Sequence, residues 1–393
     1  MTLAKDPSGT IVHEIRWSDA LPWWLLFRAA GAAFSPAVIV LAACGMLATW
    51  AGWSAADRAG FTVAAALATP ATPPAADELV LPTGQTTMTG DESALRPSRR
   101  AVPWIRDGIL RLPLPLREVL ALVTVPFRPT ATLSACTAAS CRLAWFILVW
   151  SIFGTAICRN VALKLVGEEP PGIVGGAWFG SRKWLAAFNA VLFVIVGMLV
   201  LSIPGTLLGL GMRTDIGLAF AGAVWPLVLL GAVVLAILGI GMVIGWPLMV
   251  AAVGIERGDS FQAISTAFSY LYQRPLHYAF YAVVAAAVVM PALAVAGVFA
   301  DATGTLAVWA TSFGMGHDRT ADLVAGLAGS GAMAGQWGTR AIAFWSRGLL
   351  LLLAAFGWGY FWAIATAAYM LLRQDVDGTE LDEVVLDEPG GSA

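Results

Sequence analysis

Charged residues are scarce in this sequence. They make up 12% of the 393 residues, whereas hydrophobic residues make up 59%. A soluble domain carries roughly 25% charged residues, because its surface has to face water. The shortage of charge therefore excludes a water-soluble fold for a chain of this length. The net charge of −2 also provides no basic field that would favour a nucleic-acid partner.

Histidine is rarer still, and its three copies lie far apart, at His13, His277 and His317. Phosphate-binding glycine loops, H-E-x-x-H zinc motifs and paired-cysteine zinc patterns are absent from the sequence. A membrane metalloenzyme would need several histidine or acidic ligands, and nucleophilic catalysis would need a grouping such as Cys with His. We therefore expect a protein that is not an enzyme, with no catalytic residue, no metal and no cofactor.

Cysteine is also rare, with four copies. Cys44 and Cys158 lie in or at the end of apolar runs, which is typical of small core residues. Cys136 and Cys141 are five residues apart, so on a helix they point to different faces. A disulfide between them would need a non-helical turn, and the spacing alone leaves that pairing open.

Long apolar runs are what the sequence has in abundance. Several exceed about 18 residues, the length that crosses the hydrocarbon core of a bilayer. They predict an all-α, polytopic membrane protein with about six transmembrane helices, near residues 35–53, 141–160, 185–211, 217–253, 277–300 and 346–372. Pro204-Gly205 predicts a kink in the third run, and the fourth run, which is longer than one crossing needs, must tilt, kink at Pro226 or Pro247, or begin on the surface. The breaks at Pro204-Gly205 and Trp246-Pro247 are either ordinary kinks or the two sides of a midplane site.

These runs divide the chain into five segments. We predict an N-terminal interfacial segment at 1–34, the first transmembrane helix at 35–53 and a long connection at 54–140. A main membrane domain of five transmembrane helices follows at 141–372, and an acidic, disordered tail at 373–393. The long connection begins with an Ala/Pro/Thr-rich stretch that is typical of a flexible linker. Between the fifth and sixth spans we expect a polar, glycine-rich connection, 301–345, with a short helix at 320–334.

Two segments outside the spans suit the headgroup layer of a membrane. Residues 14–34 combine several tryptophans with arginine, a pairing that favours the interface. Ser18 or Asp19 can cap a helix there, and a plain extension of the first span is the alternative. Residues 101–128 predict one or two interfacial helices or a re-entrant segment, because their apolar part is too short to cross the membrane.

A short elbow occurs on each side of the hairpin 184–254. The first elbow runs from Val161 to Trp184 and the second from Ala251 to Arg274. Each contains the end of an apolar run, an acidic turn, a short aromatic-bearing segment and a basic residue. At an offset of 90 residues, the acidic Glu169 falls on the acidic Asp259. The order of parts predicts an internal repeat.

The second elbow has the clearer helical pattern. Asp259 or Ser260 can cap a helix that Pro275 stops. Helical spacing predicts an inward face made of Phe261, Ile264, Phe268 and Leu271. The corresponding segment of the first elbow, 171–183, contains four glycines, each costing about 1 kcal/mol relative to alanine in a helix. We therefore expect 171–183 to be a less regular partner of the helix 260–274.

The distribution of lysine and arginine predicts which side of the membrane each loop faces, because short cytoplasmic loops contain more of these two residues than short outer loops do. With six spans and a cytoplasmic N-terminus, ten bases fall on inner segments: Lys5, Arg16, Arg28, Arg159, Lys164, Arg182, Lys183, Arg257, Arg274 and Arg373. Four fall on short outer loops: Arg213, Arg319, Arg340 and Arg347. This ratio predicts that both termini and both elbows are cytoplasmic.

Three of these bases are candidates for contacts with lipid phosphate. Arg182 and Lys183 close the first elbow, and Arg274 closes the second. Cations at the cytoplasmic membrane surface attract anionic headgroups. The alternative is that they only anchor the topology.

The elbows also carry a family resemblance. Its residues are Gly154-Thr155-Ala156-Ile157 before Arg159, Glu168-Glu169, Ala177-Trp178 and Arg182-Lys183-Trp184, and then Glu256 to Phe261, Ala263, Ala267-Phe268 and Gln273-Arg274-Pro275. On these residues, the stretch from about 145 to 300 resembles uncharacterised bacterial inner-membrane protein families. It is also similar to the membrane domain attached to some glycerophosphodiester phosphodiesterases. The resemblance implies a multi-pass helical domain in the bacterial cytoplasmic membrane, and it transfers no catalytic residue.

Two functions remain open on the sequence. The first is a non-enzymatic scaffold or subunit of a membrane assembly, whose partners are the lipid bilayer and another membrane protein or further copies of the chain. The second is a transporter or lipid-handling protein with a site between the two halves of the helix bundle. The bundle interior discriminates them, because a transporter needs a polar cavity at mid-membrane depth, whereas a scaffold needs only a dry, closely packed centre.

Overall fold

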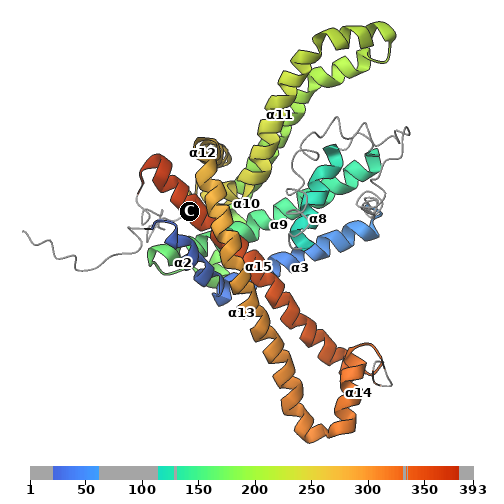
Figure 1. Cartoon of the computed structure of the whole chain (residues 1–393), viewed down its shortest axis with the longest axis vertical. Helices are drawn as coiled ribbons and strands as arrows, with labels where there is room; N and C mark the ends of the chain where they lie inside the picture. Colours follow the sequence, from blue (N-terminus) through green and yellow to red (C-terminus); the bar gives the residue numbers. More distant parts are fainter. Residues whose placement is uncertain (1–20, 62–113, 128–130, 331–332, 334, 380–393) are drawn as a thin grey trace, which may run out of the picture. The chain divides into compact units, whose positions relative to one another are not determined.

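The computed structural model describes residues 21–61, 114–127, 131–330, 333 and 335–379. Within these residues the structure is helical, with no strand, and Figure 1 gives the order of the elements. They are α2 (Trp24–Ala33), α3 (Pro36–Arg58), α8 (Leu114–Thr124), the 3-10 helix η2 (Val125–Phe127), α9 (Leu133–Val166), α10 (Gly172–Gly211), α11 (Asp215–Glu256), α12 (Ser260–Gln273), α13 (Pro275–Met315), α14 (His317–Leu327) and α15 (Trp337–Asp377).

Six of the described helices are long and apolar enough to cross a membrane: α3, α9, α10, α11, α13 and α15. Each predicted apolar run coincides with one of them, so the all-α, polytopic fold class with six spans is confirmed. Four of the helices have 40 to 42 residues. At 1.5 Å per residue such a helix is about 60 Å long, roughly twice the hydrocarbon core of a bilayer. Only part of each can therefore cross the membrane.

The chain forms two compact units: Met1–Met46 with Val149–Ala393, and Leu47–Leu148. The smaller unit joins the end of α3 to the start of α9. The Trp53 indole donates to the Arg142 carbonyl at 3.2 Å, and Arg142 forms an ion pair with Asp57. Leu122 and Val125 pack there against Ala138 and Ala139 of α9. Helix α8 lies within the predicted interfacial stretch, whose residues 101–113 are outside the described part of the chain.

The larger unit is built around the second half of α15. Helix α15 contacts α2, α11, α12, α13 and α14, and its residues from Ala355 to Leu372 are mostly buried. Helix α2 buries Leu25 and Leu26 against this unit, and the Arg28 guanidinium donates to the Leu165 carbonyl at 2.7 Å. The N-terminal interfacial segment therefore ends in a helix that packs on the core. Its predicted caps, Ser18 and Asp19, lie outside the described residues.

The first elbow differs from the expectation. Residues 171–183 are not an irregular segment, because α10 runs unbroken from Gly172 to Gly211. Two glycines allow α9 to approach instead of breaking the helix. A side chain at Gly180 would meet the Ile152 carbonyl oxygen, and one at Gly176 would meet the Asn160 amide. Close approach of helices through small residues is common in membranes, and the packing it allows offsets the low helix propensity of glycine.

The second elbow is a helix, as predicted, but its buried face is rotated. The Asp259 carboxylate accepts from the backbone N–H of Gln262 at 2.8 Å, and α12 ends at Gln273, one residue of connection before Pro275 begins α13. Of the predicted face of Phe261, Ile264, Phe268 and Leu271, only Leu271 is buried; the other buried residues are Ser260, Ala263, Ala267 and Tyr270. Phe261 is 66% exposed and stacks on Phe193 of α10. Alanine lets α12 lie close to its neighbours and Tyr270 is buried beside it, whereas the Phe261 ring lies at the edge of the helix.

The predicted connection 301–345 is largely helical. Helix α13 continues to Met315, α14 occupies 317–327 in place of the predicted 320–334, and α15 begins at Trp337. Residues 301–315 were expected to belong to the connection. They extend α13 instead, because Asp301 is their only charged residue and their alanines favour helix. Gly316, with φ +80°, makes the turn between α13 and α14. At the other end, α15 continues past Arg373 to Asp377, and residues 380–393 of the predicted tail lie outside the described chain.

The prolines do not interrupt their helices. Pro204 lies inside α10, and Pro226 and Pro247 lie inside α11. Neither Pro204-Gly205 nor Trp246-Pro247 therefore opens an unwound segment of the kind that forms a midplane site. The four cysteines are free, and Cys136 and Cys141 both lie on α9.

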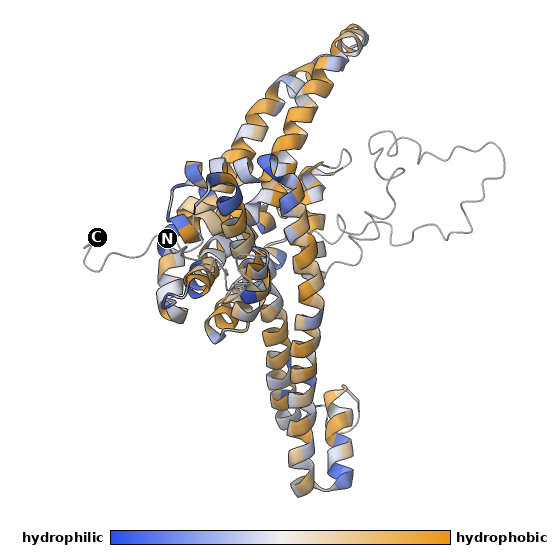
Figure 2. Ribbon diagram, turned by 60° about the vertical axis from the view of Figure 1, so that its left-hand side comes forward, coloured by the Kyte–Doolittle hydropathy of each residue, from blue (hydrophilic) through white to orange (hydrophobic). Residues whose placement is uncertain are grey.

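Much of the apolar surface of the larger unit is exposed. In α11, only 6% of the most apolar stretch is buried. In α10 and in α13, the corresponding stretch is 11% buried. Figure 2 shows hydrophobic residues along the long helices, including the parts beyond the packed core. In water such a surface would be strongly unfavourable. The exposed stretches are therefore the parts that lipid or other membrane proteins cover.

Candidate functional site

The two elbows meet at a basic cluster, the elbow junction, which consists of Arg159, Phe179, Lys183, Glu256 and Arg257. The Lys183 ammonium of the first elbow donates to the Arg257 carbonyl of the second at 2.6 Å. The guanidinium carbons of Arg159 and Arg257 lie 5.4 and 5.8 Å from the centre of the Phe179 ring. A cation over an aromatic face is attracted by the ring quadrupole, more strongly where water is excluded. These contacts join the two ends of the α10–α11 hairpin.

Arg257 has an unusual backbone. Its φ of 59° is the only positive φ at a non-glycine residue in the described chain. Helices commonly end with a residue in this left-handed conformation, and glycine is preferred there because a Cβ adds strain. Arg257 occupies the position at the end of α11, and Gly258 follows it. We infer that the side-chain contact with Phe179 and the carbonyl contact with Lys183 offset this strain.

Glu256 is the acidic centre of the junction. It accepts from the Tyr369 hydroxyl at 2.5 Å and from the Gln262 side-chain amide at 2.8 Å, and Arg373 lies 3.5 Å away. Glu256 thus has two hydrogen bonds and one ion pair, with partners from α12 and α15. The Glu256 carboxylate therefore connects the end of α11 to both α12 and α15.

A second group of polar contacts holds the end of α15. The Tyr270 hydroxyl of α12 donates to Asp377, and Asp375 pairs with Arg274 at 3.2 Å and with His277 at 3.0 Å. Burial raises the pKa of Tyr270, and the hydrogen bond and negative charge of Asp377 raise it further. The neutral phenol is therefore the form that the folded protein favours.

The three candidate phosphate-binding residues lie in different surroundings. Arg182 is exposed and lies 4.3 Å over the Trp178 ring. Lys183, the next residue on α10, donates to a backbone carbonyl in the elbow junction, and Arg274 is paired with Asp375. The structure thus places Arg182 beside Lys183, whereas the charge of Arg274 is balanced by an acid. Arg182 is therefore the exposed base of the three whose charge no acid among the described residues balances.

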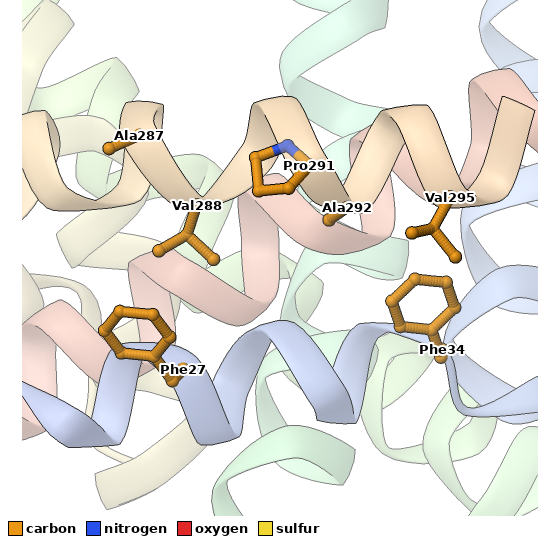
Figure 3. Close-up of a pocket in the computed structure, with 7 residues that line it drawn as sticks. All are labelled: Phe27, Phe34, Ala287, Val288, Pro291, Ala292 and Val295. Atoms are coloured by element: carbon orange, nitrogen blue, oxygen red, sulfur yellow. The ribbon is translucent and has the colours of Figure 1, made fainter.

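An apolar groove lies between α2 and α13, with a volume of about 440 Å³. Its lining is shown in Figure 3: Phe27, Phe34, Ala287, Val288, Pro291, Ala292 and Val295. Phe27 of α2 and Phe34, the residue that follows this helix, project towards the α13 residues (Figure 3). Because no charged or hydrogen-bonding side chain lines it, the groove suits a hydrocarbon chain and offers nothing to orient a polar ligand.

Sequence reasoning did not find the elbow junction. Arg159 directly follows an apolar run, and Glu256 ends about 40 residues without another charge, so both positions carried a signal. Their partners come from segments far along the chain, which spacing does not reveal. Among the described residues, no group of three or more His, Cys, Asp or Glu side chains could hold a metal ion.

No protein-family model, no curated protein and no solved structure matches this chain.

Proposed function

We propose that this chain is a non-enzymatic, multi-pass protein of the bacterial cytoplasmic membrane, and that it acts as a scaffold or subunit of a membrane assembly. The observation that carries the proposal is the exposure of α10, α11 and α13, whose most apolar stretches are 6 to 11% buried. Each presents more apolar length than a single crossing needs. Such surfaces are available to other membrane helices, which associate by close packing.

The arrangement of the polar groups supports the same proposal. Glu256, Asp375 and Asp377 are each engaged by donors from neighbouring helices. These contacts lie where helices end, and they fix the ends of α11, α12 and α15 relative to one another. Charged groups used in this way stabilise a frame on which other proteins can assemble.

The contacts also support a cytoplasmic location for both termini and both elbows. Arg28 of the N-terminal segment contacts the end of α9, Lys183 contacts the end of α11, and Arg274 contacts the end of α15. Segments that contact one another in this way belong on the same side of the membrane. The ten-to-four ratio of bases favours the cytoplasmic side.

Photo-crosslinking in native membranes tests the scaffold proposal. A photoreactive amino acid at Phe220 or Leu230, exposed positions of α11, is expected to give discrete protein adducts. The same group at Leu248, a fully buried position of the same helix, is expected to give none. Lipid adducts alone at both exposed positions would contradict the proposal.

The groove in Figure 3 favours lipid handling as the second candidate. An acyl chain is the ligand that a wholly apolar lining suits. Val288→Trp would fill the groove, whereas Val283→Trp changes an exposed position of the same helix outside the lining. Lipid handling predicts that native mass spectrometry finds less lipid retained by the first variant only. Equal lipid retention by both variants would reject this alternative.

A further inference from the structure

Several buried polar groups in the core of the larger unit have no hydrogen-bond partner among the described residues, and three of them lie on facing turns of α9 and α15. These three are the Ser151 and Thr155 hydroxyls of α9 and the indole N–H of Trp362 of α15. All three residues are 0% exposed. Buried polar groups in native proteins are nearly always paired, either with protein or with ordered water.

The three groups lie close to one another. Ser151 and Thr155 are one turn apart and share a face of α9. The Trp362 ring lies against the same helix at Gly154, where an added Cβ would be 2.9 Å from Cε2. The indole nitrogen is bonded to that Cε2 atom, so its N–H lies beside the turn that carries the two hydroxyls.

Aromatic rings close the surroundings of the site. Trp150 stacks on Trp358 at 4.6 Å and on Trp362 at 5.8 Å, and Trp246 of α11 meets Trp362 edge-on at 5.2 Å. These distances are between ring centres. The rings separate the three polar groups from bulk solvent, so a molecule that pairs with them has to be small.

Hydroxyl groups in helices usually bond to the carbonyl three or four residues earlier. Thr366 does so, with its hydroxyl 2.8 Å from the Trp362 carbonyl. Ser151 and Thr155 do not, and their hydroxyls are therefore free to bind another molecule. Leaving them unpaired in a closely packed core would be costly.

We propose that Ser151, Thr155 and Trp362 bind ordered water inside the helix core. Water fits the chemistry because each hydroxyl both donates and accepts, and the indole only donates. A cation is disfavoured, because the indole N–H would point its hydrogen at it. An anion is disfavoured as well, because the three groups are neutral and cannot balance its charge. A site with three polar partners is the usual setting of a buried water molecule.

A polar face of α15 connects the site to the charged end of that helix. From Trp362 it continues through Thr366, Tyr369 and Arg373, at intervals of four, three and four residues. This spacing keeps the side chains on one helix face. Tyr369 and Arg373 reach Glu256 in the elbow junction.

X-ray hydroxyl-radical footprinting of the full-length protein in detergent tests the proposal, because radicals formed from bound water label adjacent side chains. Phe356, on the same helix and 2% exposed, is the dry reference. After correction for intrinsic reactivity, Trp362 is expected to be labelled several-fold faster than Phe356. Equal rates would overturn the proposal without any variant.

A variant pair then assigns the water to the two hydroxyls. Ser151→Ala with Thr155→Val is expected to slow the labelling of Trp362. The matched control is Ser202→Ala with Thr206→Val on α10, whose exposed hydroxyls bond to their own helix; it should leave the rate unchanged. If the variant with Ser151→Ala and Thr155→Val folds and Trp362 is still labelled at the wild-type rate, the proposed water ligands are wrong. If that variant does not fold, the comparison of Trp362 with Phe356 in the wild-type protein still decides whether water is present.

Discussion

Gly241 of α11 shows how a single small residue holds two helices together. A Cβ at this position would lie 2.6 Å from the Phe268 ring and 2.6 Å from the Tyr272 hydroxyl of α12. Tyr272 also donates to the Ile237 carbonyl at 2.5 Å, so its hydroxyl is already held against α11. Neither ring can move away without losing its contact with that helix.

Gly241→Ala is therefore expected to destabilise the protein, by roughly 1–3 kcal/mol, the usual cost of overpacking. Gly231→Ala is the matched control on the same helix, because nothing lies within 4 Å of a Cβ there. At that position alanine should be neutral or stabilise by up to about 1 kcal/mol. Thermal unfolding in detergent compares the two variants. A control that loses as much stability as Gly241→Ala would show that the close approach of α12 is not responsible.

Tyr270 gives the protein a dependence on alkaline pH. Its pKa is raised above the usual value by burial and by Asp377, so the folded state favours the neutral phenol. The stabilisation is complete below the unfolded pKa, about 10, and is lost as the pH rises beyond it. The melting temperature should therefore fall above about pH 10, and by less in Tyr270→Phe, which cannot ionise. Parallel pH profiles for the two proteins would contradict this account.

At the scale of helices, the six spans and their helical type could be predicted, but their exact ends and their facing sides could not. The six spans follow from apolar run length, and the cap at Asp259 and the stop at Pro275 follow from local chemistry. The buried face of α12 was predicted wrongly because large apolar residues were taken as inward. In a membrane protein the outside is apolar as well, so large side chains do not mark the core; small residues at close contacts do.

The candidate site could be predicted to a similar extent. The bases of both elbows were visible in the sequence, and the structure brings Lys183 to Arg257. The contacts of Glu256 with Tyr369 and Arg373 join residues more than 100 positions apart. Such contacts depend on how α11 and α15 pack, and no local pattern encodes them.

The rotated face of α12 makes a prediction of its own. Ala267 is fully buried, so Ala267→Leu should overpack the contact and cost roughly 1–3 kcal/mol. Ser265→Leu introduces the same side chain at an exposed position of the same helix and should cost much less. Unfolding in detergent measures both. If the Ser265 variant were the less stable one, the face that the structure assigns to the core would be wrong.

For the whole molecule, the proposed topology predicts accessibility. In a background without the native cysteines, Asp259→Cys should react only with a membrane-permeant thiol reagent, because the second elbow is expected in the cytoplasm. Asp318→Cys, in α14, should react with an impermeant reagent applied to intact spheroplasts. The reverse pattern would mean that the ten-to-four ratio of bases assigns the wrong side.

The scaffold proposal is tested most directly by the composition of the particle that carries the chain. Polymer extraction into native nanodiscs keeps lipid and neighbouring proteins together without detergent. Mass analysis of these particles is predicted to find the chain with a second membrane protein or with further copies of itself, because α10, α11 and α13 leave most of their apolar surface uncovered. Particles that contain a single copy of the chain and lipid alone would contradict the account.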